Sequence, residues 1–213
     1  KELQEAGYLS VDIAHRLPAK DQGIRTPEPG EWVVFISHFL RGLGFPLHPF
    51  VRGLMFYYGL DFHDLAPNSF LHISAFIVAC EVLLRIPPHF GLWLRVLNVK
   101  PKVVDGQHAD CSEAMISKLP NTTWPKGAFV ETVKIWQQEW FYTTEPRRTK
   151  WAAIPEFRSG PPMRLTSWNE KGIDWGSQTE VLALQTRITN MLGKNVGFTN
   201  VIQIMLFRCI PPC

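Results

Sequence analysis

The chain has 213 residues, of which 46% are hydrophobic and 12% aromatic, and its formal net charge is +3. This composition excludes an intrinsically disordered protein, because it supplies enough apolar material for one packed domain, or for one domain with a small appendage. The small excess of basic residues is typical of an ordinary soluble surface, so charge alone does not predict nucleic-acid binding.

The cysteines are few and widely separated in the sequence: Cys80, Cys111, Cys209 and Cys213. No secretory signal is recognisable before them, and the pattern predicts reduced thiols. We therefore expect an intracellular protein, nuclear or cytoplasmic, and not a secreted one. Because the first residue is Lys1 and the last follows two prolines, we also expect the sequence to be a piece of a longer protein.

The first part of the chain changes character near Glu31. Residues 1–30 contain several prolines, glycines and charges, which is typical of a short amphipathic segment followed by an exposed linker. From Trp32 to Leu43 the apolar residues recur at helical spacing, so a helix is predicted there. A second helix is predicted from Pro49, a favourable first helical residue, to Gly59.

The most apolar part of the chain lies between Pro67 and Pro88. Asn68 or Ser69 can cap a helix here, and apolar residues follow on both of its faces, which predicts a buried central helix that ends at the double proline. The apolar run is only about 15 residues and contains Glu81, whereas roughly 20 residues are needed to cross a bilayer, so no membrane span is expected. A short helix is predicted after Pro88, through Leu97.

The middle of the chain is polar and weakly periodic. Residues 100–125 are interpreted as a long connection with one short helix at 112–117. A brief strand at 128–133, a helix through Trp140 and an extended segment at 141–144 are predicted next. The proline-rich and glycine-rich span that follows is expected to wrap over the helical core through its tryptophans.

Helical patterns return near the end of the chain. Ser177 and Glu180 match a capping box, and Val181, Leu184 and Ile188 continue with helical spacing. A last apolar helix is predicted at residues 201–210. Its large apolar side chains need a partner, either this domain or a second chain, and form the predicted interaction surface. They are Ile202, Met205, Leu206 and Phe207.

Together these elements predict a mainly α protein, a helical globular domain with a minor β element and a C-terminal helical extension. The expected organisation is an N-terminal linker or fragment edge at residues 1–30, a main domain at 31–145, an aromatic-rich irregular wrap at 146–176 and a C-terminal helical segment at 177–213.

Several segments of the main domain, in this order, also carry a family resemblance. They are Glu31–Phe35, Phe39–Pro46, Phe56–Leu60, the helix after Pro67 and Trp136–Tyr142. Over residues 31–145 the chain resembles the plant family of putative gypsy-type transposon domains. The resemblance implies a reading frame derived from a retrotransposon in a plant genome. It describes ancestry, and it implies neither transposase activity nor any catalytic residue.

Common enzyme motifs are absent from the sequence. It contains no Tyr-x-Asp-Asp, Asp-Thr-Gly or Asp-Ser-Gly string, no Cys-x2-Cys pair, no phosphate-binding loop and no Gly-x-Ser-x-Gly elbow. Asp105, Asp110 and Glu113 lie too close together on a polar loop to predict a two-metal site. We therefore expect a protein that is not an enzyme and has no catalytic residues and no cofactor.

The possible metal ligands and histidines are interpreted as structural. His108, Asp110 and Cys111 match no established spacing, so no metal site is predicted. His72 and Glu81 lie on one predicted helix about 13 Å apart and cannot meet for acid–base chemistry. Satisfied structural roles are expected for the histidines of the helical half, which are His38, His48, His63, His72 and His89.

The best candidate for nucleic-acid binding is a basic strip with an aromatic residue: Arg147, Arg148, Lys150 and Trp151. Basic side chains contact phosphates, and exposed aromatic rings stack on bases. The competing interpretation, in which the tryptophans are core anchors with a solvated charged rim, is favoured. The predicted function is thus a non-catalytic structural or protein-interaction module that binds a protein partner or itself, with nucleic-acid binding as the alternative.

Overall fold

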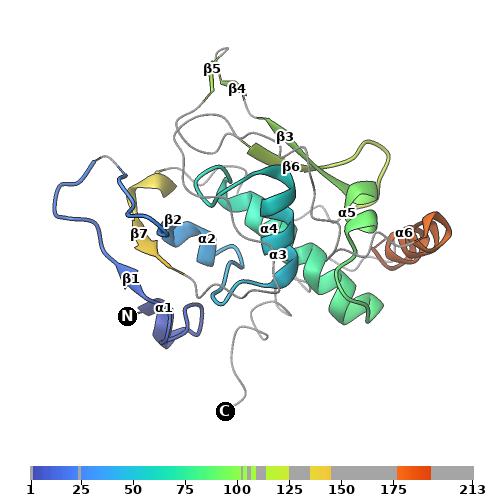
Figure 1. The fold of residues 1–213 in the computed structure, drawn as a ribbon. Coiled ribbons are helices and arrows are strands. Elements are labelled where there is room, and N and C mark those ends of the chain that lie inside the picture. The colour runs from blue at the N-terminus through green and yellow to red at the C-terminus, as the bar shows by residue number, and fades with distance from the viewer. Residues whose placement is uncertain are drawn as a thin grey trace.

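The computed structural model describes residues 2–23, 25–101, 103–104, 107–108, 114–124, 135–144 and 177–192. These residues form a mainly helical fold with small antiparallel sheets, which confirms the predicted fold class (Figure 1). The helices are α1 (Glu2–Glu5), α2 (Ile36–Phe39), α3 (Pro49–Tyr58), α4 (Pro67–Val78), η1 (Ala79–Leu84), α5 (Phe90–Val96), η2 (Trp136–Gln138) and α6 (Gln178–Leu192). The strands are β1 (His15–Arg16), β2 (Trp32–Phe35), β3 (Leu97–Pro101), β4 (Val103–Val104), β5 (Gln107–His108), β6 (Ala114–Lys118) and β7 (Trp140–Thr143).

Helix α4 and its continuation η1 form the centre of the core, as predicted. Both faces of α4 are buried, and Phe76 packs against Trp93 of α5 with ring centroids 5.3 Å apart. The predicted ends were wrong. Pro67 occupies the first turn behind Ala66, with no side-chain cap, and the helix widens into a π-helical turn. It stops at Arg85, whose φ of 57° is left-handed, before the double proline is reached.

The stretch Pro67–Leu84 is also long and apolar enough to span a membrane, judged by its 18 residues and their composition. Most of it is buried inside the fold. The core helix of a soluble protein has the same properties, so this is weak evidence for a membrane. The expectation that the protein has no membrane partner stays a prediction.

Helices α3 and α5 each begin at a histidine that accepts a backbone hydrogen bond. His48 Nδ1 accepts from the Phe50 N–H at 3.1 Å, and His89 Nδ1 accepts from the Leu92 N–H at 3.1 Å. These contacts occupy backbone donors that have no partner inside the first helical turn. At its other end α3 stops at Gly59 with a φ of 64°, as its sequence predicts.

A three-stranded antiparallel sheet, in the order β1-β7-β2, replaces the helix predicted from Trp32. Val33 pairs with Tyr142 and Val34 with Phe141, so this part of the chain is extended, and only Ile36–Phe39 is helical. The strand partner is more than one hundred residues away, which local spacing does not reveal. Within residues 1–30, Leu9 lies in the core and β1 joins this sheet, so the predicted exposed linker is limited to the stretch after β1.

The connection predicted at residues 100–125 contains an antiparallel strand pair instead. Strands β3 and β6 pair from Leu97 with Lys118 to Pro101 with Ala114, so the short helix predicted at 112–117 was wrong. In β6, the buried residues Ala114 and Ile116 alternate with more exposed neighbours. Strands β4 and β5 form a second small pair beyond β3.

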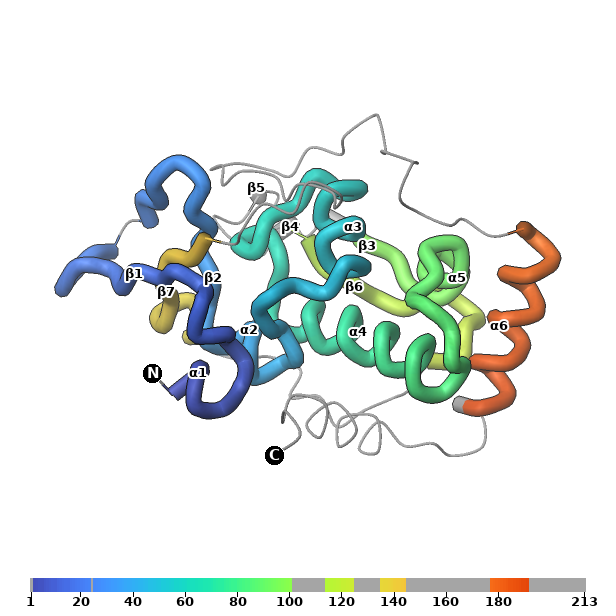
Figure 2. Tube along the Cα trace, turned by 60° about the horizontal axis from the view of Figure 1, so that its bottom comes forward, coloured from blue at the N-terminus to red at the C-terminus, as the bar shows by residue number. Residues whose placement is uncertain are grey.

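Helix α6 packs beside α5 and η1 through the three apolar residues predicted for its buried face, Val181, Leu184 and Ile188 (Figure 2). Ser177 Oγ accepts the Glu180 N–H at 3.2 Å, which is the capping bond expected of this sequence. This apolar stripe of α6 is therefore covered by other parts of the same chain.

The remaining predictions for the second half have mixed outcomes. The extended segment at 141–144 is largely confirmed by β7. The helix through Trp140 was wrong, since a short 3-10 turn at Trp136–Gln138 precedes the strand. The strand predicted at 128–133, the wrap at 146–176 and the helix at 201–210 lie outside the described residues. The division of the chain into domains stays a prediction.

Candidate functional site

A cavity of about 440 Å³ lies where the N-terminal segment and the loop before α3 meet α3, α4 and η1. Its wall is mostly apolar, formed by residues such as Phe45, Val51, Phe70, Ile77 and Val78. The loop carries Gly42 with a φ of 94°, a left-handed conformation that favours glycine, and it then pairs with the N-terminal segment at Leu9 and Phe45. The N-terminal segment thus contributes Gly7 and Tyr8 to the cavity wall.

The main polar feature of this cavity is the pair formed by His48 and Glu81. His48 Nε2 lies 2.9 Å from Glu81 Oε1, and the two side chains are 33% and 26% exposed. Because His48 Nδ1 accepts the Phe50 N–H, the proton of a neutral ring must sit on Nε2, which donates it to Glu81.

Ser74 also lines the cavity, so a serine, a histidine and a carboxylate occur together there. Nucleophilic catalysis needs a histidine with one nitrogen on the carboxylate and the other free to take the serine proton. In this protein the second nitrogen of His48 is used by the Phe50 N–H, and Ser74 Oγ donates to the Gly42 carbonyl at 3.0 Å. The three residues are not arranged as a catalytic triad.

Two further histidines serve inside the core. His38 Nε2 donates to the Leu65 carbonyl at 3.0 Å, and burial lowers the pKa of His38 to about 3. His72 Nδ1 accepts from Trp124 Nε1 at 3.1 Å, and burial lowers the pKa of His72 to about 4. Both rings are therefore neutral near pH 7 and have a structural role, as predicted. The prediction that each is satisfied was wrong for His38, because its buried Nδ1 has no hydrogen-bond partner among the described residues.

Asp61, His63 and Asp64 form a buried group whose possible metal-ligand atoms all lie within 4.8 Å of one another. This group was not predicted from the sequence. Its carboxylates have a structural use: Asp64 Oδ2 accepts the Asp61 N–H at 2.8 Å, and Asp61 Oδ1 accepts the His63 N–H at 2.6 Å. These are the local bonds of an aspartate-stabilised turn, which here leads into α4.

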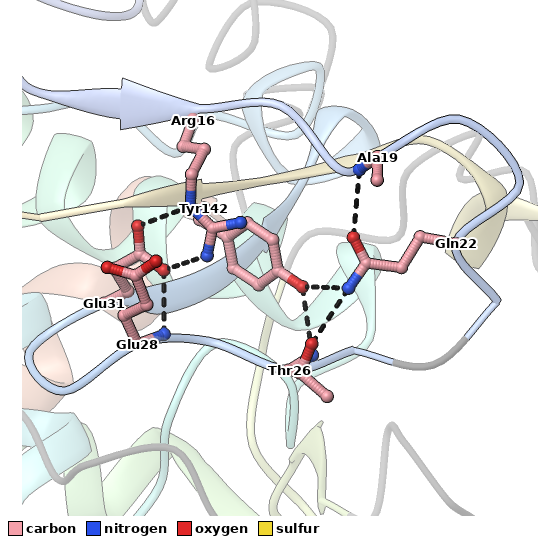
Figure 3. A network of polar contacts seen from close by, with 7 residues as sticks. All are labelled: Arg16, Ala19, Gln22, Thr26, Glu28, Glu31 and Tyr142. Atoms are coloured by element: carbon pink, nitrogen blue, oxygen red, sulfur yellow. Dashed lines mark hydrogen bonds and ion pairs between the residues drawn. The ribbon is translucent and has the colours of Figure 1, made fainter.

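A second polar network ties the N-terminal segment to β7 (Figure 3). The Tyr142 hydroxyl accepts from the Thr26 N–H and from Gln22 Nε2, both at 2.9 Å. Arg16 lies over the Tyr142 ring, 3.9 Å from its centroid, and makes a two-point contact with Glu31. The hydrogen bond from Arg16 lowers the pKa of Glu31. These groups hold the N-terminal segment against β7. Their arrangement is not that of a catalytic site.

The residues predicted for binding lie outside the described residues: Arg147, Arg148, Lys150, Trp151, Ile202, Met205, Leu206 and Phe207. Of the metal ligands that were considered, Asp110 and Cys111 also lie outside them, and His108 belongs to β5. Cys80 is buried with a free thiol, and burial raises its pKa to about 12. Such a thiol is an inert core residue rather than a nucleophile.

The cavity itself was missed by sequence reasoning, although two signals were visible. His48 directly precedes the proline that starts α3, and Glu81 is an isolated acidic residue in an apolar helix. The rejected partner of Glu81 was His72, which contacts Trp124 instead. The actual partner of Glu81 is His48, the residue that caps the start of a different helix, α3.

The described residues define a mainly helical domain built around one buried helix, with small antiparallel sheets and an apolar cavity beside that helix. Residues 33–101 match the family model described as "Putative gypsy type transposon". The resemblance is thus confirmed for this part of the chain, which runs from β2 to the end of β3 and includes most of the cavity wall. The Trp136–Tyr142 segment lies outside the match. No curated protein and no solved structure matches the chain.

Proposed function

We propose that the protein is a non-catalytic structural or protein-interaction module of a plant protein derived from a gypsy-type retrotransposon. The family match supports the transposon ancestry. The observation that carries the non-catalytic part is the use of the cavity's polar groups. His48 caps α3 with one nitrogen and holds Glu81 with the other, and the Ser74 hydroxyl is engaged by a carbonyl.

The distribution of apolar and polar groups favours binding over catalysis. Binding pockets are concave and mostly apolar, with a few placed polar groups that orient what they bind. The cavity beside α4 has this composition. Catalysis would require convergent titratable groups able to exchange protons with a substrate. Both ring nitrogens of His48 are instead used in hydrogen bonds within the protein.

An intracellular location, nuclear or cytoplasmic, is part of the proposal. The buried, free thiol of Cys80 is compatible with a reducing compartment. Partners are expected to be proteins, including a second copy of the chain. The stripe of α6 is covered by its own domain, so self-association would depend on Ile202, Met205, Leu206 and Phe207.

Nucleic-acid binding is the rival function. The strip of Arg147, Arg148 and Lys150 follows β7 within a few residues in the sequence. Binding through phosphates would weaken steeply with added salt.

The test combines two measurements on the full chain. Light scattering over a range of concentrations should show a mass that rises with concentration and responds little to salt. Fluorescence anisotropy with labelled single-stranded and double-stranded DNA and RNA should show no binding at low salt. Salt-sensitive binding that disappears in the triple variant Arg147→Ala, Arg148→Ala, Lys150→Ala would overturn the proposal in favour of the rival.

A further inference from the structure

The cavity beside α4 is lined mainly by apolar side chains that are well shielded from water. They come from the loop before α3, from α3 and from α4. Six of them are each 9% exposed or less: Leu43, Phe45, Val51, Phe70, Ile77 and Val78. Water in such a space finds few hydrogen-bond partners, and apolar cavities of this kind can stay dry and take up apolar molecules. An apolar ligand therefore gains free energy by leaving water for this cavity.

The polar side chains of the wall are already engaged within the protein. Ser74 Oγ donates to the Gly42 carbonyl at 3.0 Å. His48 uses one ring nitrogen for a backbone N–H of α3 and the other for Glu81. Tyr8 and Glu81 each have a further interaction within the protein. A ligand that brings a polar group must therefore displace one of these contacts or bury the group unpaired, and both cost free energy.

The volume and the edges of the cavity limit the size of the ligand. At about 440 Å³ the cavity is in the lower part of the range of small-molecule pockets, so it suits one ring or a short aliphatic chain. One edge is the N-terminal segment, held to the loop by a hydrogen bond of 2.9 Å from the Phe45 N–H to the Tyr8 carbonyl. Another edge is the π-helical turn η1, which carries Glu81. Such turns are rare in proteins and are frequently found at functional sites.

We propose that this cavity binds a small neutral apolar molecule, of the size of one ring, without a hydrogen bond or an ion pair to the protein. The ligand packs against Phe70, Ile77 and Val78, and the burial of its surface drives binding. This inference adds a ligand site to the protein-interaction function and does not depend on it.

The test compares toluene with phenol, which has nearly the same size but carries a hydroxyl group. Each is titrated into the full chain, and binding is followed by calorimetry and by shifts of the protein NMR signals. Toluene should bind saturably and at least about tenfold more tightly than phenol, because burial of a hydroxyl group without a partner costs free energy.

Two matched variants locate the site. Ile77→Trp adds volume to the wall, so the affinity for toluene should fall at least about tenfold. Leu182→Trp also introduces a tryptophan, at a residue of α6 that is 45% exposed and does not line the cavity, and binding should be unchanged. Toluene should accordingly raise the unfolding temperature of the wild type and of Leu182→Trp but not that of Ile77→Trp. Thermal unfolding without ligand shows whether each variant is folded.

Three results would each overturn the proposal. The first is phenol binding as tightly as toluene, which would show that polar groups of the wall are available to a ligand. The second is the absence of saturable toluene binding in the millimolar range. The third is a folded Ile77→Trp variant that binds toluene as the wild type does. The wild-type comparison decides the matter even if Ile77→Trp fails to fold.

Discussion

His48 and Glu81 are 33 positions apart in the sequence, yet a hydrogen bond of 2.9 Å joins His48 Nε2 to Glu81 Oε1. His48 begins α3, and Glu81 lies in the π-helical turn that extends α4. One imidazole therefore caps one helix and holds the side chain of another. Because each ring nitrogen has a separate task, substitutions at this position can distinguish them.

His48→Ala should lower the free energy of unfolding by about 1–2 kcal/mol, because it removes the cap of α3 and the donor to Glu81. His48→Asn should recover part of this loss, since asparagine is a strong capping residue but is too short to replace Nε2. Urea denaturation of the wild type and the two variants measures the three free energies of unfolding. Equal losses in the two variants would show that the cap contributes little.

Acid should destabilise the protein through its buried histidines. The folded-state pKa of His72 is about 4 and that of His38 about 3, both below the ordinary value of 6.5. Between pH 6.5 and these values the unfolded chain binds protons that the folded protein does not, so stability falls as pH falls. The limiting slope is about 1.4 kcal/mol per pH unit for each histidine.

The measurement is the urea midpoint of the wild type and of His72→Gln at a series of pH values from 7 to 4. Glutamine keeps an acceptor for Trp124 but does not titrate, so the variant should lose less stability on acidification. Parallel curves for the two proteins would contradict the assignment to His72.

Tyr142→Phe should loosen the N-terminal segment. The change removes the oxygen that accepts from Thr26 and Gln22 and leaves the ring beneath Arg16. We expect a loss of about 1–2 kcal/mol and faster amide hydrogen exchange in the segment between β1 and β2. Hydrogen-exchange mass spectrometry checks this, with α6 as the internal reference. Unchanged exchange in that segment would show that the network does not hold it.

The core should be most sensitive at Phe76, which is fully buried and packs against Phe50 and Trp93. Phe76→Ala should cost about 3–5 kcal/mol, from lost burial and from the cavity left behind. Leu182→Ala is the matched control, because Leu182 on α6 is 45% exposed and should cost less than about 0.5 kcal/mol. Thermal and urea unfolding compare the two. Similar losses would contradict the central position of α4.

The helices could be predicted from sequence where their signals are local. Pro49 and Gly59 mark the ends of α3, and Ser177 marks the start of α6, because a cap or a left-handed residue acts within one turn. The buried character of α4 follows from apolar residues on both faces. Its ends did not follow, since a π-helical turn and the left-handed Arg85 depend on how η1 packs.

Only the tertiary structure decided the strands and the cavity. The residues from Trp32 onward fit a helical spacing equally well, and they become a strand because β7 supplies hydrogen bonds from more than one hundred residues away. The N-terminal segment became part of the core for the same reason. The cavity depends on the meeting of His48, Glu81 and the loop at Gly42. Contacts between distant segments have no local periodicity, whereas the hydrogen bonds of a helix connect near neighbours, and for that reason the sequence by itself determined helices with strong local signals, such as α3, α4 and α6, but not the strands.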